Sequence, residues 1–290
     1  MNGAESLVKT LLAGEVNVCF SNPGTSEMHF VAALDANPEM RCVLGLFEGV
    51  VTGAADGYYR MTDRPAATLL HLGPGLANGL ANLHNAKKAR SGIVNIVGDH
   101  ATYHLEYNAP LTSDIEGFAA PVSHWIRTSP DAATVSADGA LAIEAARTHP
   151  GRVATLILPA DTAWGRAADI AIVKDPDPPA GPDHEVVLQA AKALRSGQPA
   201  TLLLGDRALR EGTLELAGRI AVGTGCGLLA ESANSRVERG AGRVAVNRIP
   251  YSVDKALDIL GNAGQLILVG AEEPVAFFAY PGKPSILKAE

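Results

Sequence analysis

Short apolar runs alternate with amphipathic stretches along the first 160 residues of the chain. Runs of about five nearly all apolar residues are typical of strands buried on both faces of a sheet. The longer stretches between them repeat their apolar residues with helical spacing. This alternation predicts a mainly parallel sheet with helices on both faces. We predict strands at Val16–Phe20, Arg41–Leu46, Ala66–His71, Ile93–Val97 and Val153–Leu158, and helices at Ala4–Ala13, Ser26–Asp35, Gly49–Met61, Leu76–Arg90 and Ala132–Arg147.

A proline-rich segment predicts a division of the chain into two domains. Four of the eight residues from Asp175 to Pro182 are proline, which cannot continue a helix or a central strand. We therefore predict a first α/β domain over residues 1–165, a linker over 166–183, and a second, incomplete α/β domain over 184–290. Both domains are predicted to be doubly wound, with mainly parallel sheets. In the second domain we predict a helix at His184–Ser196 and strands at Ala200–Leu204, Gly227–Ala230 and Gln265–Val269.

The composition narrows the class of protein. A chain of 290 residues, 47% of them hydrophobic, can bury two cores of ordinary domain size. A formal net charge of −7 argues against a nucleic acid or an anionic membrane as a partner. No apolar run approaches the ~20 residues that span a bilayer. Three widely separated cysteines, and no visible export signal, lead us to expect a cytoplasmic protein with reduced thiols.

Glu48 follows an apolar strand and opens the next predicted helix. Beside Phe47 and small apolar residues its carboxyl group should be poorly solvated, which disfavours its charged form. A carboxyl group in that state can pass a proton near neutral pH. An acid in the first turn of a helix also stabilises the helix dipole, so the position of Glu48 by itself leaves both roles open.

Three more polar residues lie where predicted strands end. Asn22, His71 and Asp99, like Glu48, come at or just after the end of a strand. The carboxyl ends of parallel strands share one edge of a sheet, where doubly wound proteins bind ligands. We therefore expect a single cleft to gather these four side chains.

Two turns should bring backbone close to a ligand in this cleft. Asn22-Pro23-Gly24 forms a tight turn before a helix that Thr25 or Ser26 can cap. Gly73-Pro74-Gly75 is predicted to form a glycine-rich loop before a helix, where backbone can approach an anion or a planar ring.

Each of these features also has a purely structural interpretation. A lone histidine such as His71 is most often a buried, hydrogen-bonded residue, and Asp99 could simply cap the following segment. The glycine spacing is not that of a dinucleotide fingerprint. The cluster of His100, Tyr103, His104 and Glu106 lacks the spacing of metal ligands, so no metal site is predicted within the chain.

Taken together, the motifs resemble those of a known family. They are Asn22-Pro23-Gly24, Glu48 followed by Ala54-Ala55-Asp56-Gly57-Tyr58, and Gly73-Pro74-Gly75 with Asn78. In this order and spacing they look like the pyrimidine-binding domain of thiamine-diphosphate-dependent enzymes, which include acetolactate synthases, pyruvate oxidases and benzoylformate decarboxylase. The resemblance covers Met1 to about Thr162 as the pyrimidine-binding domain, and about Asp183 to Glu290 as the family's Rossmann-like central domain.

The resemblance implies roles for these residues. It makes Glu48 the acid that binds N1′ of the cofactor's aminopyrimidine and so activates the cofactor, which carries the difficult chemistry. It places Asn22, Pro23, Gly24, Gly73, Pro74, Gly75 and Asn78 around the cofactor. His71 and Thr25 look like the histidine and serine that benzoylformate decarboxylase uses on its substrate, and Asp99 is expected at the rim of the substrate site.

Departures from the family pattern refine the expected activity. Leu46-Phe47-Glu48 stands where acetolactate synthases usually have Arg-His-Glu, and Gly98-Asp99 where they have Gly-Gln. We therefore expect C–C bond cleavage or formation on a 2-oxo acid by a decarboxylase-like or acetolactate-synthase-like enzyme, and not by a true biosynthetic acetolactate synthase. The alternative is a catalytically silent binding or regulatory module that has kept the fold.

The family's third domain is not recognisable in this sequence. Its Gly-Asp-Gly…Asn motif, which holds Mg²⁺ and the diphosphate, is absent, and Gly205-Asp206-Arg207 breaks the motif at its third position. We therefore expect a fragment that is inactive alone, with Mg²⁺ bound through the missing domain. The resemblance further implies a homodimer or homotetramer. FAD binding to the central domain is left open, because no flavin fingerprint is present.

Overall fold

The computed structural model describes residues 1–288 and divides the chain into two compact units, Met1–Pro179 and Ala180–Glu290. Their boundary lies inside the predicted linker. Residues 167–183 form neither helix nor strand. The first part of this segment packs on unit 1, because Ala171 donates its backbone N–H to Oγ1 of Thr10 at 3.2 Å and Val173 packs on the hydrophobic core.

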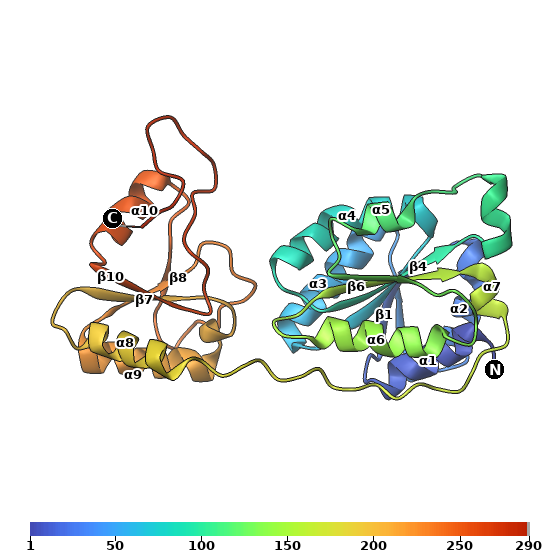
Figure 1. The fold of residues 1–290 in the computed structure, drawn as a ribbon, viewed down its shortest axis with the longest axis horizontal. Helices are drawn as coiled ribbons and strands as arrows, with labels where there is room; N and C mark the ends of the chain where they lie inside the picture. Colours follow the sequence, from blue (N-terminus) through green and yellow to red (C-terminus); the bar gives the residue numbers. More distant parts are fainter. Residues whose placement is uncertain (289–290) are drawn as a thin grey trace. The chain divides into compact units, whose positions relative to one another are not determined.

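Unit 1 contains a six-stranded sheet in which all the strand pairs are parallel (Figure 1). The nearly all-apolar strands occupy its middle, as expected for strands covered on both faces. The order across the sheet is β2 (Arg41–Leu44), β1 (Val18–Asn22), β3 (Ala66–Leu70), β4 (Ile93–Asp99), β6 (Val153–Pro159) and β5 (Trp125–Thr128).

Helices cover both faces of this sheet (Figure 1). Alternate residues of β4 point to opposite faces, so that Val94 and Ile96 join one core and Ile93 and Val97 join the other. The first core is closed by α1 (Gly3–Ala13), α2 (Met28–Asp35), α6 (Val135–Arg147) and α7 (Ala160–Trp164), and the second by α3 (Glu48–Thr62), α4 (Leu72–Lys88) and α5 (Ile115–Ala119).

A buried chain of polar side chains crosses the middle of the sheet. Thr68, Asn95 and Thr155 are register partners on β3, β4 and β6. Thr68 donates to Oδ1 of Asn95 at 2.7 Å, Asn95 donates to Oγ1 of Thr155 at 3.0 Å, and Thr155 is hydrogen-bonded to Ser123 at 2.7 Å. These links satisfy polar groups that would otherwise be costly inside an apolar sheet.

Unit 2 has a four-stranded parallel sheet. Leu202 and Leu204 of its central strand join the core beneath α9, while Leu203 joins the core beneath α10. The strand order is β10 (Gln265–Val269), β7 (Ala200–Leu204), β8 (Gly227–Ala230) and β9 (Asn247–Arg248), and the helices are α8 (His184–Leu194), α9 (Glu211–Thr224) and α10 (Val253–Gly261).

The predicted α/β class with two mainly parallel sheets is confirmed, and the bounds of several elements differ from prediction. β1 and β4 each end two residues later than predicted, so Asn22 and Asp99 are the last residues of strands and do not lie beyond them. The strands β5 and β9 and the helices α5, α7, α9 and α10 were not predicted. β5 and β9 are short and partly exposed, which removes the long apolar signal that marks a central strand.

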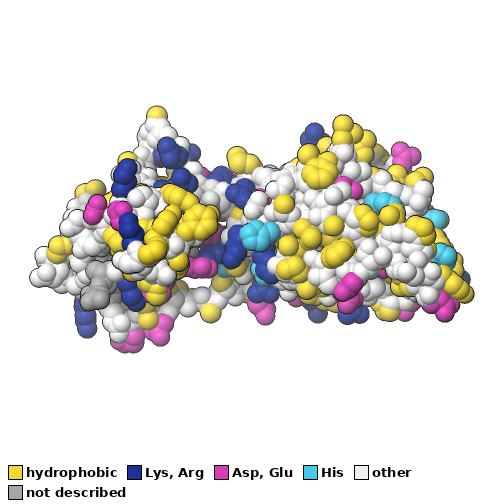
Figure 2. Space-filling view, turned by 90° about the horizontal axis from the view of Figure 1, so that it is seen from above, with side chains coloured by type: hydrophobic (Ala, Val, Ile, Leu, Met, Phe, Trp, Pro, Cys, Tyr) yellow, Lys and Arg dark blue, Asp and Glu magenta, His cyan; other side chains and the backbone are white. Residues whose placement is uncertain are grey.

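The surface shows no broad field of one charge sign on the face drawn in Figure 2, where cationic, acidic and apolar side chains are interspersed. Within residues 1–288, no helix is long and apolar enough to cross a membrane.

Candidate active site

Glu48 is the first residue of α3 and lies at the carboxyl end of the sheet of unit 1. β2 ends at Leu44, and Phe47 has the extended backbone of an N-cap residue. Glu48 is 9% exposed, and its Oε2 accepts a hydrogen bond from the Asn78 side-chain amide at 2.9 Å. A Cβ at Gly75 would lie only 3.1 Å from the other oxygen, Oε1. The carboxyl group is thus largely buried, with one oxygen bonded and the other beside a residue without a side chain.

Close packing of α3 on α4 holds Glu48 in place. Thr52 donates to the carbonyl oxygen of Gly79 at 3.1 Å, and Asn82 donates to that of Gly49 at 2.6 Å. A Cβ at Gly79 would lie 2.9 Å from Cγ2 of Thr52, tighter than normal packing allows. Glycine at this position therefore brings the two helices close enough for these bonds.

The segment Gly73-Pro74-Gly75 is not a loop, which corrects our prediction. α4 already begins at Leu72, so these residues form its first turn. Proline is tolerated there because the first N–H groups of a helix have no partner within the helix. Leu72 is buried, with a φ of 53°, a left-handed conformation that is uncommon for leucine and costs about 1–3 kcal/mol. This conformation makes the sharp change of direction between β3 and α4.

His71 lies in that change of direction and is bonded to a residue that we had not predicted as part of the site. Its Nδ1 is 2.7 Å from Oε2 of Glu27, whose side chain is 1% exposed. The same oxygen accepts the backbone N–H of Gly24 at 2.7 Å. The sequence signal for Glu27 was its position three residues after Gly24, typical of an acid that closes the first turn of a helix. Its contact with His71, 44 residues away, has no local signature.

Two glycines make room for this pair. A Cβ at Gly24 would overlap the His71 ring, and a Cβ at Gly98 would overlap Oε1 of Glu27. Gly24 follows β1 and Gly98 lies in β4, so the ends of both strands contribute to the site. Asn22, the last residue of β1, is the register partner of Leu70, which directly precedes His71.

Gly75 connects His71 to Glu48. A Cβ at this position would lie 3.1 Å from Glu48 Oε1 and 3.4 Å from His71 Cβ. Glu48 and His71 therefore flank the same glycine, and the His71 side chain is 24% exposed rather than buried behind the sheet. Gly73 is different, because Ser113 fills the space where its side chain would be.

Asp99 lies close to Glu27 at the end of β4. Burial raises the pKa of the Asp99 carboxyl group, and the charge of Glu27 adds to this effect, while the His100 backbone N–H and the His100 ring act against it. Oδ1 of Asp99 accepts that backbone N–H at 2.7 Å, so the residue also caps its own strand end, as its structural interpretation suggested.

Thr25 is exposed in a short 3-10 turn, Thr25–Glu27. We expected Thr25 or Ser26 to cap the following helix through its side chain. Instead, Glu27 makes the side-chain bond that closes this turn, by accepting the Gly24 N–H. That prediction was wrong because the longer glutamate side chain can reach back across the turn.

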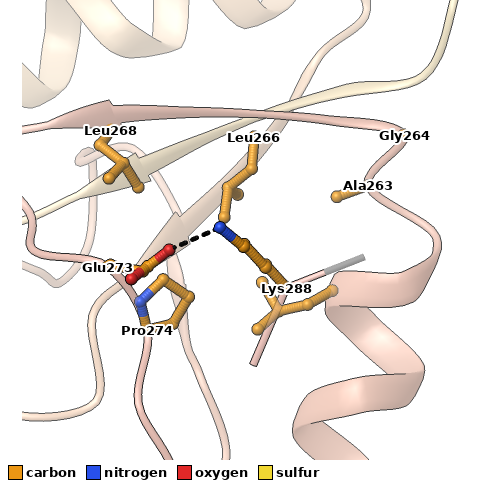
Figure 3. A pocket seen from close by; sticks show the side chains of 8 residues that line it. Ala263, Gly264, Leu266, Leu268, Glu273, Pro274 and Lys288 are labelled. Atoms are coloured by element: carbon orange, nitrogen blue, oxygen red, sulfur yellow. Dashed lines mark hydrogen bonds and ion pairs between the residues drawn. The ribbon is translucent and has the colours of Figure 1, made fainter. Parts of the chain in front are cut away.

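Unit 2 contains a separate pocket of about 300 Å³ (Figure 3). Its wall is mostly apolar, and an ion pair of 2.9 Å between Lys288 and Glu273 lies across it. It lacks the hydrogen-bonded buried carboxyl groups of the cluster around Glu48. Within residues 1–288, no group of three or more His, Cys, Asp or Glu side chains is arranged to hold a metal ion.

Comparison with known proteins identifies relatives of the chain. Residues 1–120 match the family described as thiamine pyrophosphate enzyme, N-terminal TPP binding domain. A Mycobacterium tuberculosis protein assigned by name to the acetolactate synthase large subunits, IlvX, is 54% identical over 99% of this chain and 55% of its own length. Benzoylformate decarboxylase of Pseudomonas aeruginosa is 30% identical over 66% of this chain and 34% of its own length. The chain thus spans about half the length of the first relative, and its match covers about a third of the second.

Solved structures share the fold. A thiamine diphosphate-dependent 4-hydroxybenzoylformate decarboxylase from Rhodococcus jostii matches all of this chain with a TM-score of 0.88 and 21% identity, and the match covers 55% of that protein. The motifs around Glu48, the matched N-terminal domain and the named relatives all agree. The chain therefore belongs to the thiamine-diphosphate-dependent enzyme family. Within this family it is similar to the acetolactate-synthase-like and benzoylformate-decarboxylase-like members.

Proposed function

We propose that this chain provides the pyrimidine-binding half of a thiamine-diphosphate site that cleaves or forms a C–C bond on a 2-oxo acid. The observation that carries the proposal is the environment of Glu48. Its carboxyl group is largely buried at the start of α3, with Oε2 bonded by Asn78 and Oε1 beside Gly75. A group held in this way can keep or release a proton at a fixed position.

The residues around Glu48 fit the cofactor. The missing side chain of Gly75 leaves room next to Oε1 of Glu48, so a flat ring could approach that oxygen. We propose that Glu48 holds a proton shared with N1′ of the aminopyrimidine, and that Asn22, Pro23, Gly24, Gly73, Pro74, Gly75 and Asn78 surround the cofactor. When bound, thiamine diphosphate supplies the carbon nucleophile and the electron sink for 2-oxo acid chemistry.

We propose that His71 and Thr25 face the substrate, with Asp99 at the rim. His71 is partly exposed beside the glycine that also borders Glu48, so its ring can move a proton there. Thr25 is exposed on the turn after β1, where its hydroxyl group can donate to a carboxylate.

Two further parts of the site are proposed from the sequence. The Gly-Asp-Gly…Asn motif is absent from these 290 residues, so we propose that Mg²⁺ and the diphosphate are bound by a domain outside them. We also propose that a second copy of the protein packs beside Glu48. Leu46 and Val50, which lie on either side of Glu48 in the chain, are 92% and 60% exposed and would be covered there.

The test compares the 290-residue chain with the product of the complete reading frame. In titration calorimetry with Mg²⁺ and thiamine diphosphate, we expect no measurable binding to the chain alone, since each charge-assisted phosphate bond contributes about 1.5–3 kcal/mol. In the complete protein, Glu48→Gln should slow C2–H exchange of the bound cofactor by orders of magnitude with the fold intact. Wild-type exchange in that variant would refute the role of Glu48. Micromolar binding and turnover by the chain alone would refute the missing half-site.

A further inference from the structure

We propose that Glu27 is a positioning residue that keeps a proton on Nδ1 of His71 and thereby presents Nε2 as the reactive nitrogen. The inference rests on the proposed function for its catalytic meaning. Its structural content, the tautomer of His71, stands on the contacts of the chain itself.

Glu27 bonds His71 and Gly24 through the same carboxyl oxygen. Oε2 of Glu27 lies 2.7 Å from Nδ1 of His71 and 2.7 Å from the backbone nitrogen of Gly24. When the Glu27 carboxyl group is ionised it can only accept hydrogen bonds, and Nδ1 then carries the proton that lies between the two groups. In the neutral ring the other nitrogen, Nε2, is then left with a free lone pair.

The two side chains of this pair differ in exposure. The Glu27 carboxyl group is buried, and its Oε1 has no hydrogen-bond partner within the described residues. The His71 side chain is 24% exposed, and no described residue is hydrogen-bonded to its Nε2. The pair therefore joins a buried carboxyl group to an imidazole that is partly exposed.

Burying the Glu27 carboxyl group has an energetic cost. A buried carboxyl oxygen without a hydrogen-bond partner destabilises the fold. An exposed acceptor would be enough to close the turn after Gly24, so capping alone does not explain why the Glu27 carboxyl group is buried. The fixed direction of the imidazole is the property that the buried carboxylate adds.

The charged groups around His71 come from three parts of the fold. Glu27 faces the ring from the turn after β1, and Glu48 of α3 lies across Gly75. Asp99 and His100 lie at the end of β4, where Asp99 interacts electrostatically with Glu27. When Nε2 takes a proton from a hydroxyl group or a water molecule at the reacting centre, Nδ1 of the resulting imidazolium lies 2.7 Å from Oε2 of Glu27, which compensates its charge. The proton can return by the same path.

The experiment observes the ring nitrogens directly. The 290-residue chain, labelled with ¹⁵N-histidine, is studied by long-range ¹H–¹⁵N correlation at a pH where the imidazole is neutral, with His71→Gln identifying the signals. We expect His71 as the Nδ1–H form. In Glu27→Ala the ring should move toward the Nε2–H form that solvated histidines favour. Glu27→Gln keeps an acceptor oxygen and should retain the Nδ1–H form. Asp99→Asn, which removes a nearby carboxylate not bonded to His71, should leave the tautomer unchanged.

Every outcome bears on the proposal. An Nε2–H form in the wild-type chain overturns it even if Glu27→Ala fails to fold, and so does an unchanged Nδ1–H form in a folded Glu27→Ala. In the complete enzyme, Glu27→Ala should lower kcat at least tenfold with little change in KM, and Glu27→Gln should recover part of that loss. If the tautomers are as expected but the complete protein turns over no 2-oxo acid, the inference about Glu27 stands and the proposed function is refuted.

Discussion

The Asn78 side-chain amide donates a hydrogen bond of 2.9 Å to Oε2 of Glu48, which joins the second turn of α4 to the first residue of α3. We had predicted Asn78 as a contact of the cofactor. Its position makes it also a support for the residue proposed to activate that cofactor, because the bond fixes which oxygen of Glu48 remains available.

Asn78→Asp should turn this attraction into a repulsion. Two carboxylates would face each other, so the folded state would take up a proton more readily than the unfolded chain, and stability would fall as the pH rises. We expect a loss of about 1–2 kcal/mol at pH 7.5, near the lower end for charge-assisted bonds because Asn78 is exposed, and a smaller loss at pH 4. Urea unfolding at both pH values measures it. Asn85→Asp, an exposed change on the same helix, is the control, and equal losses in the two variants would contradict the assignment.

Gly98→Ala should disrupt the Glu27–His71 pair. The new methyl group would overlap Oε1 of Glu27, which lies in a packed interior and has little room to move. We expect a loss of about 1–3 kcal/mol in unfolding free energy. The control is Gly57→Ala on an exposed part of α3, where nothing lies within 4 Å of the added atom. Alanine should stabilise that helix by about 0.5–1 kcal/mol. A Gly98→Ala protein as stable as the wild type would show that the space is not limiting.

Asp99→Asn should change how stability depends on pH. Burial raises the pKa of Asp99 in the folded protein, so between the unfolded and folded pKa values the folded state binds more protons than the unfolded one. Ionisation of Asp99 therefore removes stability as the pH rises from about 4. Asparagine keeps the oxygen that accepts the His100 N–H, and it does not ionise. The variant should match the wild type near pH 3 and gain relative stability above it. Asp35→Asn, at an exposed site, should show no such trend.

Leu46→Asp should weaken the proposed self-association. Leu46 is 92% exposed two residues before Glu48, where the proposal places a second copy of the chain. A charge in that interface would be desolvated without a partner. Sedimentation velocity over a concentration series should show a dimer in the wild type and at least a tenfold weaker association in the variant. Val222→Asp, at a 90% exposed position in unit 2, is the matched control. Equal association of all three proteins would place the contact elsewhere.

The parts of the fold that could be predicted are those with a strong local signal. β4 reads as an apolar run interrupted only by Asn95, and its central, doubly covered place follows from that pattern. Glu48 was predicted to open a helix and does so. By contrast, the start of α4 was missed by four residues, since glycine and proline signal a loop and only the left-handed Leu72 allows the helix to begin at once.

The site shows the same limit. Asn22, Glu48, His71 and Asp99 were placed at one edge of the sheet from strand ends alone, which topology dictates. Glu27 was missed because its partner His71 is distant in the chain and belongs to another strand connection. The space that Gly24 and Gly98 leave for this pair is a tertiary property, and it becomes visible only when β1, β3 and β4 are side by side.

The buried polar chain from Thr68 through Asn95 to Thr155 has a consequence for how the sheet assembles. If β4 slipped by one residue against its neighbours, Asn95 would point to the opposite face and all of these partners would be lost together. Each polar group left without a hydrogen-bond partner would then reduce the stability of the sheet by about 1–3 kcal/mol. Apolar strands such as β3 and β6 pair almost equally well in several registers, so this row of side chains selects one register. The selected register in turn fixes the relative positions of the strand ends that carry the site.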